Sequence, residues 1–292
     1  MKKMIAMMLA LLMILSLCAC GAKEAEAPAQ EAPAAEAPAA EAPAQEAPAE
    51  EPAEEAEPTD MEYVKEKGVL VVGITDFAPM DYKNDAGEWV GFDADMAKGF
   101  AEYLGVEVEF VEIEWGSKIL EIDAKNIDCV WNGMTLTDEV TSAMDCSNAY
   151  CNNAQVVIVP ADVADQYQTV ESIAELAFAA EAGSAGEKEL LALGYECTGV
   201  LAQSDALMEV AAGTSDAAVI DSLMAAAMVG EGTGYADLTY TVGLNTEEYG
   251  VGFRKGSDLV AALNDYFAQA YADGSMIECA QTYGVQAALI AQ

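Results

Sequence analysis

Histidine is absent from the 292 residues of this chain, and arginine occurs only once, at Arg254. The lack of histidine removes the commonest metal ligand and the commonest general base near neutral pH. Basic residues are scarce altogether, because 12 lysines and arginines stand against 51 aspartates and glutamates and leave a formal net charge of −39. A chain this acidic repels nucleic acid and anionic lipid headgroups. We therefore expect no metal site, no cofactor and no nucleic-acid partner.

The first twenty residues, MKKMIAMMLALLMILSLCAC, combine two lysines, an apolar run and a small residue before Cys20. The apolar run is shorter than the roughly 20 residues that span a bilayer, so residues 1–20 predict a secretory signal peptide. The segment LCAC resembles a bacterial lipobox, in which Cys20 becomes the lipidated N-terminus; an ordinary cleaved signal is the alternative. We expect an extracytoplasmic protein that is lipid-anchored to the cell membrane.

Residues 21–60 repeat units such as EAPAQ and EAPAA, without aromatic residues and with Thr59 as the only β-branched one. Such a segment has too little apolar surface to fold, and its prolines and glutamates favour extended conformations. We predict a disordered Ala/Pro/Glu linker over 21–60 that carries a folded body.

Seven cysteines are present, and five of them follow Cys20. An odd number in an exported chain leaves at least one thiol unpaired. Cys146 and Cys151 are close enough in sequence to pair, whereas buried free thiols are the alternative that we favour.

Apolar β-rich runs alternate with amphipathic helical patterns through residues 61–292. Val69–Ile74 and Gln155–Pro160 predict buried strands, and Gly91–Leu104 predicts a helix. The alternation predicts an α/β protein with parallel-type sheets flanked by helices. Ligands of such sheets bind at the carboxyl ends of the strands. The residues that follow predicted strands are therefore candidates for a site: Thr75, Asp76, Phe77, Asn132, Gly133, Thr135, Gly183, Ser184 and Asp221.

Seven segments along the chain resemble the solute-binding proteins of polar amino-acid ABC importers. The resemblance covers essentially all of 64–284. The segments occur in the order of that family: GITDFAPMDY, GEWVGFDADMAKGFAEYLG, IDCVWNGMTLTDE, EAGSAGEKEL, DAAVIDS, YGVGFRKGS and YADGSMIECAQTYG. The resemblance implies a two-lobe, class II periplasmic-binding-protein-like fold with two crossover strands, near Cys151–Val156 and Glu248–Val251. It places 61–152 and 250–292 in lobe 1 and 153–249 in lobe 2.

The resemblance also implies roles for single residues. Phe77 and Trp115 match aromatic residues that stack on ligand, whereas core packing is the alternative and is the one that we favour for Trp131. Asp221 matches a carboxylate that binds the α-amino group of the ligand; an N-cap role is its alternative. Other ligand contacts are implied at the strand ends and at a helix N-terminus: Thr75, Asp76, Asn132, Gly133, Thr135, Ser184 and Ala185.

One departure from the family pattern concerns the ligand carboxylate. Val140 occupies the position where an arginine usually clamps it, and Arg254 lies in another motif. Either backbone N–H groups and Thr135, helped by Lys118, bind the carboxylate, or the ligand is not a standard α-amino acid. With Asp76, Asp81 and Asp221 near the expected cleft, a neutral or cationic amine fits better than an acidic amino acid.

The sequence therefore favours a monomeric binding protein that delivers an amino acid or related small amine to an ABC permease and its ATPase. An exported enzyme of the same fold, such as a dehydratase, is a second hypothesis. The lack of histidine and of a cleft arginine argues against it, although Glu181 or Asp76 could act as acid or base. A ligand sensor for a membrane receptor is a third.

Overall fold

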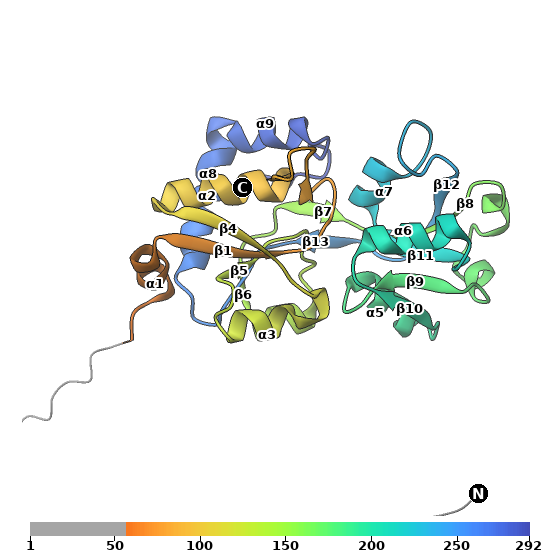
Figure 1. Cartoon of the computed structure of the whole chain (residues 1–292), viewed down its shortest axis with the longest axis horizontal. Helices are drawn as coiled ribbons and strands as arrows, with labels where there is room; N and C mark the ends of the chain where they lie inside the picture. The colour runs from red at the N-terminus through yellow and green to blue at the C-terminus, as the bar shows by residue number, and fades with distance from the viewer. Residues whose placement is uncertain (1–56) are drawn as a thin grey trace, which may run out of the picture. The chain divides into compact units, whose positions relative to one another are not determined.

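Two five-stranded sheets organise the residues that the computed structural model describes, 57–292 (Figure 1). The predicted signal peptide, Cys20 and most of the predicted linker lie outside these residues. We call the part built on the first sheet lobe 1 and the part built on the second sheet lobe 2.

Lobe 1 is built on a sheet with the strand order β4-β1-β5-β14-β6. Strand β1 pairs in parallel with β4 and β5, whereas β14 runs antiparallel to β5 and β6. The strands are β1 (Val69–Ile74), β4 (Glu107–Glu112), β5 (Cys129–Val130), β6 (Asp145–Cys146) and β14 (Gly252–Phe253), with a hairpin of β2 (Tyr82–Lys83) and β3 (Trp89–Val90). The helices are α1 (Asp60–Lys67), α2 (Phe92–Leu104), the 3₁₀ turn η1 (Trp115–Ser117), α3 (Lys118–Asp123), α4 (Asp138–Ala143), α8 (Leu259–Asp273) and α9 (Ser275–Thr282).

Lobe 2 is built on a sheet with the order β10-β9-β11-β8-β12, in which β9, β10 and β11 are parallel. Its strands are β8 (Gln155–Pro160), β9 (Phe178–Glu181), β10 (Cys197–Val200), β11 (Ala217–Asp221) and β12 (Leu238–Gly243). Its helices are α5 (Ala185–Ala192), α6 (Gln203–Ala212) and α7 (Ser222–Met228), with 3₁₀ turns η2 (Ala164–Gln166) and η3 (Val170–Ile173). Figure 1 shows α5 and α6 on opposite sides of this sheet.

Two short strands connect the lobes. Strand β7 (Cys151–Asn153) and strand β13 (Glu247–Tyr249) pair antiparallel between the two sheets (Figure 1). Strand β13 ends at Tyr249, and β14 begins at Gly252. Gly250 lies at the break, where a Cβ atom would come within 2.6 Å of the Leu136 side chain. The strands predicted over Val69–Ile74 and Gln155–Pro160 match β1 and β8, and the helix predicted over Gly91–Leu104 begins one residue later, at Phe92.

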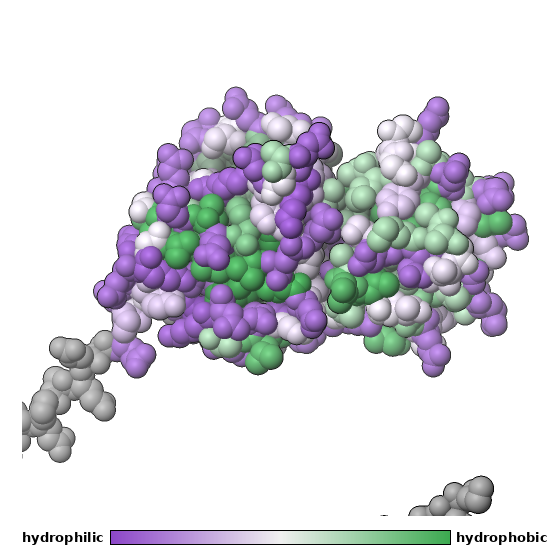
Figure 2. Space-filling model, viewed as in Figure 1, coloured by the Kyte–Doolittle hydropathy of each residue, from purple (hydrophilic) through white to green (hydrophobic). Residues whose placement is uncertain are grey.

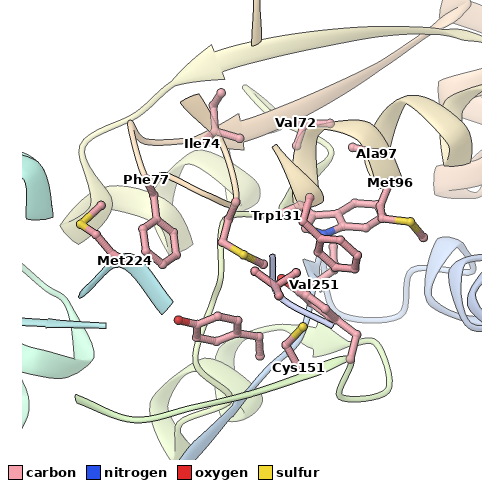
Figure 3. Packing of buried hydrophobic residues seen from close by; sticks show 14 of the residues in the cluster. Val72, Ile74, Phe77, Met96, Ala97, Trp131, Cys151, Met224 and Val251 are labelled. Carbon is pink, nitrogen blue, oxygen red and sulfur yellow. The ribbon is translucent and has the colours of Figure 1, made fainter. Parts of the chain in front are cut away.

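The main hydrophobic core contains the aromatic cluster of lobe 1 (Figure 3). Trp131 is fully buried and packs edge-on against Phe100 and Phe267, with ring centroids 6.3 and 5.6 Å apart. The core role that the sequence favoured for Trp131 is therefore confirmed. The same cluster includes Phe77 of lobe 1 and Met224 of helix α7 in lobe 2.

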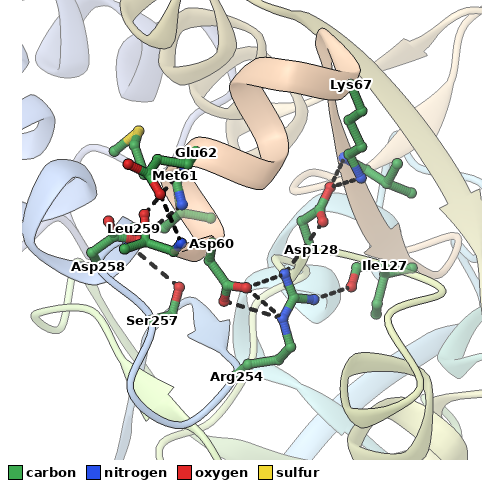
Figure 4. A network of polar contacts seen from close by, with 12 residues as sticks. Asp60, Met61, Glu62, Lys67, Ile127, Asp128, Arg254, Ser257, Asp258 and Leu259 are labelled. Atoms are coloured by element: carbon green, nitrogen blue, oxygen red, sulfur yellow. Dashed lines mark hydrogen bonds and ion pairs between the residues drawn. The ribbon is translucent and has the colours of Figure 1, made fainter. Parts of the chain in front are cut away.

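Helix α1 begins at Asp60, which is the last residue of the predicted linker. Thr59 and Glu62 form a capping box, in which the Thr59 hydroxyl accepts from the Glu62 N–H and the Glu62 carboxylate accepts from the Thr59 N–H. Asp60 pairs with Arg254, whose guanidinium also donates to the Ile127 carbonyl and to buried Asp128 (Figure 4). Asp60 therefore belongs to the folded part of the chain, and the prediction that the linker includes it is wrong.

All five cysteines of the described residues are free thiols, Cys146 and Cys151 among them. Within residues 57–292, no helix is long and apolar enough to span a bilayer, and no group of acidic and cysteine side chains could hold a metal ion. The face shown in Figure 2 has hydrophilic residues over much of lobe 1, interspersed with smaller hydrophobic areas.

Candidate functional site

A pocket lies between the two lobes and is lined by residues from both of them. Most of the predicted site residues line it, namely Trp115, Asn132, Gly133, Thr135, Ser184, Ala185 and Asp221. They come from the loop after β5, from η1, from the start of α5 and from the end of β11. These segments follow strands or begin helices, as the rule that ligand sites form at the carboxyl ends of parallel strands predicts.

Three predicted site residues are not among the lining residues. Thr75 is buried and pairs with Asn132, Asp76 is exposed at the surface, and Phe77 is only 2% exposed. The Phe77 ring packs edge-on against Tyr249 and lies directly beneath Gly133, where a Cβ atom would come within 2.3 Å of it. In this structure Phe77 is thus a core residue below the pocket floor and not a stacking surface for ligand.

The polar groups after strand β5 bind mainly to protein partners. The Asn132 side-chain amide accepts from the Thr75 N–H at 3.0 Å and donates to its hydroxyl at 2.8 Å. The Gly133 N–H donates to Asp93 at 2.6 Å, and the Thr135 hydroxyl donates to Glu247 at 2.9 Å. These contacts fix the shape of the loop. They also leave fewer free donors for a ligand than the sequence suggests.

Asp221 is 4% exposed and lies at the centre of a hydrogen-bonded network. Its carboxylate accepts from the Tyr249 hydroxyl at 2.7 Å, from Gln155 at 2.9 Å, and from Asn153 and Gln203. Burial raises the pKa of Asp221 to about 7, and the nearby carboxylate of Glu247 adds to the effect.

The side chain of Asp221 does not cap helix α7, although the residue occupies the N-cap position. Asn153 takes that role instead, since its side-chain oxygen accepts from the Ser222 hydroxyl and from the Leu223 N–H. The Asp221 carboxylate is therefore directed to the pocket and its surrounding network.

Glu181 is a pocket residue that was not among the predicted ligand contacts. It is the last residue of β9, is 2% exposed and lines the pocket, and its Oε1 atom has no hydrogen-bond partner among the described residues. Burial raises the pKa of Glu181 to about 8, and Asp221 contributes to the increase. Its position at a strand end, two residues before Gly183 in the sequence EAGS, could have identified Glu181 as a pocket residue. Gln203, at the start of α6, gave no comparable signal.

The start of helix α5 contributes Ser184 and Ala185 to the pocket. The Ser184 hydroxyl accepts from the Glu187 N–H at 3.1 Å, and the Gly183 N–H donates to the Glu187 carboxylate at 2.7 Å. The Gly183 N–H, which the sequence suggested as a donor to a ligand, is therefore already bound to Glu187. The Ala185 N–H belongs to the first helical turn and has no intrahelical acceptor.

Basic groups in the pocket are limited to two lysines, Lys118 and Lys188. Lys188 pairs with Glu139 across the lobes, with both side chains partly exposed. Val140 is buried and packs with Trp115, Met134 and Met144, so no guanidinium occupies that position. Arg254 is bound in the lobe 1 network instead (Figure 4).

This combination of two α/β lobes, two connecting strands and a polar pocket between the lobes defines a two-lobe binding protein of the periplasmic type. A family model of the bacterial extracellular solute-binding proteins, family 3, matches residues 70–286, and the chain belongs to that family. The resemblance found in the sequence is thereby confirmed, as is the fold class that it implied.

Single proteins of known function are also similar to this chain. The L-cystine-binding protein TcyJ of Escherichia coli (strain K12) is 28% identical over 218 residues, which cover 73% of this chain and 81% of that protein. Cyclohexadienyl dehydratase of Pseudomonas aeruginosa is 27% identical over 139 residues, or 47% of this chain and 52% of the enzyme.

A solved structure shares the fold. It is that of an ABC uptake transporter substrate-binding protein from Streptococcus pneumoniae with bound histidine. This structure superposes with a TM-score of 0.71 at 29% sequence identity and covers 77% of this chain and 96% of its own.

Proposed function

We propose that this protein captures an amino acid or a related small polar amine between its two lobes and delivers it unchanged to the permease and ATPase of an ABC importer. Membership of the solute-binding family supports the binding role. Related proteins named for cystine binding and solved with histidine support an amino-acid ligand. The pocket between the lobes supplies the place where such a ligand would be enclosed and shielded from water.

The charge of the pocket supports a ligand that is neutral or cationic overall. The observation that carries this step is Glu181, a buried carboxyl whose Oε1 atom lacks a partner and which shares the pocket with buried Asp221. A ligand ammonium or guanidinium would form a charge-assisted hydrogen bond with Glu181. The second carboxylate of an acidic amino acid would be repelled by the ionised form of either Glu181 or Asp221. Glutamate and aspartate are therefore poor candidates.

A direct test is a thermal-shift screen of the purified body, residues 57–292, against amino acids, polyamines and betaines, followed by calorimetric titration of the compounds that bind. We expect stabilisation by one or more neutral or cationic amino acids and none by glutamate or aspartate. Tight binding of glutamate would contradict the proposed charge preference. Absence of binding by any amino acid or amine would contradict the proposed function.

The enzymatic alternative rests on the same glutamate. With its pKa near 8, Glu181 is largely protonated at neutral pH and could donate a proton to a bound substrate. The dehydratase relative makes such an activity a specific second hypothesis. Incubating the protein with its ligand and recovering the ligand by mass spectrometry distinguishes the two. An unchanged mass supports the binding protein, and loss of water or carbon dioxide supports the enzyme.

Residues 1–20 support an extracytoplasmic location, and we propose that the mature protein is a monomer lipid-anchored through Cys20. The predicted Ala/Pro/Glu linker, 21–60, would then hold the lobes away from the membrane. Metabolic labelling with a tagged fatty acid tests this proposal. We expect label on the wild type and none on the Cys20→Ala variant.

A further inference from the structure

Lys118 places a positive charge inside the pocket without a carboxylate partner. Lys118 is the first residue of helix α3 and is only 6% exposed. Its ammonium lies 4.5 Å from the centre of the Trp115 ring. The ammonium donates to two backbone carbonyls, Trp115 in lobe 1 at 3.1 Å and Gly183 in lobe 2 at 3.2 Å. An ammonium group has three N–H donors, so one donor remains for another partner.

The surroundings of Lys118 are incomplete for a buried charge. Other lysines of the described residues, such as Lys67 and Lys188, form ion pairs with aspartate or glutamate, but Lys118 forms none. Burial lowers the pKa of Lys118 to about 8, and nearby Lys188 lowers it further, whereas Glu139 and Glu181 act in the opposite direction. An anionic group placed in the pocket would stabilise the charged ammonium.

The remaining pocket chemistry points to a carboxylate at this place. The arginine that commonly clamps it in this family is replaced by buried Val140, which has no donor. The hydrogen bond from Lys118 to the Gly183 carbonyl places the ammonium near the start of helix α5. The Ala185 N–H lies in the first turn of that eight-residue helix. A helix N-terminus favours a negative group.

We propose that Lys118 binds the carboxylate of the ligand with its third N–H, in place of the arginine that is absent at position 140. This inference rests on the proposed function, because it requires a ligand with a carboxylate in the pocket. It resolves the choice left open by the sequence in favour of an amino acid over a simple amine. It also makes Lys118, and not Lys188, the residue that distinguishes an amino acid from its decarboxylated analogue.

The experiment compares matched ligand pairs on matched variants. L-arginine, L-histidine and L-lysine are each paired with the amine formed by decarboxylation: agmatine, histamine and cadaverine. Affinities are measured calorimetrically at pH 7 for the wild type, Lys118→Met, Lys118→Arg and the exposed control Lys65→Met, and circular dichroism reports whether each variant is folded. The pair whose amino acid binds the wild type most tightly is used.

We expect the wild type to prefer that amino acid over its amine by about ten- to a hundredfold. Lys118→Met should remove this preference by weakening binding of the amino acid without weakening binding of the amine, and Lys118→Arg should retain part of the preference. Lys65→Met should behave like the wild type.

Two results would overturn the inference alone: an unchanged preference in Lys118→Met, or wild-type protein that binds the amine as tightly as the amino acid. If Lys118→Met does not fold, Lys118→Arg and the wild-type comparison still decide between these outcomes. Wild-type protein that binds neither an amino acid nor an amine would instead overturn the proposed function, and the inference with it.

Discussion

Gly116 of lobe 1 and Gly183 of lobe 2 face each other so closely that a Cβ atom on Gly183 would lie 2.6 Å from the Gly116 Cα atom. Real Cβ atoms do not approach backbone atoms at this distance, so a side chain at position 183 would push the lobes apart. The Lys118 bond to the Gly183 carbonyl and the Lys188–Glu139 ion pair bridge the lobes in the same region. The closed arrangement of this pocket therefore depends on a glycine at position 183.

Gly183→Ala should weaken ligand binding by hindering lobe closure. The expected loss is at least about tenfold, corresponding to roughly 1.4 kcal/mol, because the ligand would lose contacts with one of the lobes. Small-angle scattering with saturating ligand should show a smaller decrease in radius of gyration than for the wild type.

Gly194→Ala is the matched control for this variant. Gly194 is also in lobe 2 and has nearly the same backbone angle, φ +80° against +77°, but a Cβ atom there would contact nothing within 4 Å. Both variants should lose about 1–2 kcal/mol of stability from the left-handed backbone conformation. Only Gly183→Ala should change affinity and closure; equal affinities for the two variants would refute the role of Gly183 in closing the lobes.

The single arginine is structural in this fold, so Arg254→Met should lower stability without changing ligand affinity. Its guanidinium bridges Asp60 and Asp128, and Asp128 is fully buried. Removing one partner of a buried ion pair typically costs about 3–5 kcal/mol. Because Lys67 still pairs with Asp128 at 2.6 Å, we expect a loss at or below the lower end of this range. Urea denaturation would measure the loss.

The neighbouring residue provides the control. Lys255 forms an ion pair with Asp145 in which both side chains are largely exposed, so Lys255→Met should cost about 1 kcal/mol or less. A loss of ligand affinity in folded Arg254→Met, but not in Lys255→Met, would show that Arg254 does more than stabilise lobe 1.

The parts of the fold that depend on local pattern were predictable from the sequence. The apolar run VLVVGI forms β1 over Val69–Ile74, and Ser184 caps α5 as its position suggests. The lobe boundaries at 152/153 and 249/250 remain a prediction. The two separate five-stranded sheets are consistent with a division of the chain into two lobes.

The partners of the site residues were not predictable, because they depend on pairings between distant segments. Asn132 is bound by Thr75 across 57 positions of sequence, and Gly133 by Asp93 across 40. Phe77 follows a strand end like the lining residues do, yet the local backbone turns its ring under Gly133. Sequence position identified the segments around the pocket, whereas side-chain direction required the packing of the whole lobe.

Protonation of Glu181 should make stability depend on pH in a defined direction. Its pKa is about 8 in the folded protein and its ordinary value is 4.5. Between these values the folded protein holds a proton that the unfolded chain has released, so the free energy of unfolding falls as pH rises. Glu181→Gln should make this slope shallower and become more stable relative to the wild type from pH 5 to pH 8, while Asp221, whose pKa burial also raises, keeps its own contribution to the slope. Exposed Glu196→Gln should leave the slope unchanged, and identical slopes in all three proteins would contradict the assignment.

A cationic ligand should also release a proton from the pocket when it binds. At pH 7 most Glu181 carboxyls are neutral, and a ligand cation favours the ionised form. Calorimetric titration in two buffers with different ionisation enthalpies would report the number of protons released. We expect a fraction of one proton for the wild type and a smaller value for Glu181→Gln; equal values would exclude contact between the ligand cation and Glu181.

Asp221→Asn should abolish most of the affinity for an amine ligand. The substitution removes a buried negative charge and also places an amide NH₂ against the donors of Gln155, Gln203 and Tyr249. Losing a charge-assisted hydrogen bond costs about 1.5–3 kcal/mol, which is roughly ten- to a hundredfold in affinity. Asp237→Asn is the control, because Asp237 is exposed in the same lobe. Titration of both variants with the best ligand of the screen, with thermal melting to verify folding, tests the prediction. Folded Asp221→Asn that binds as tightly as Asp237→Asn would remove Asp221 from the binding site and leave Glu181 as the buried acid that recognises the ligand.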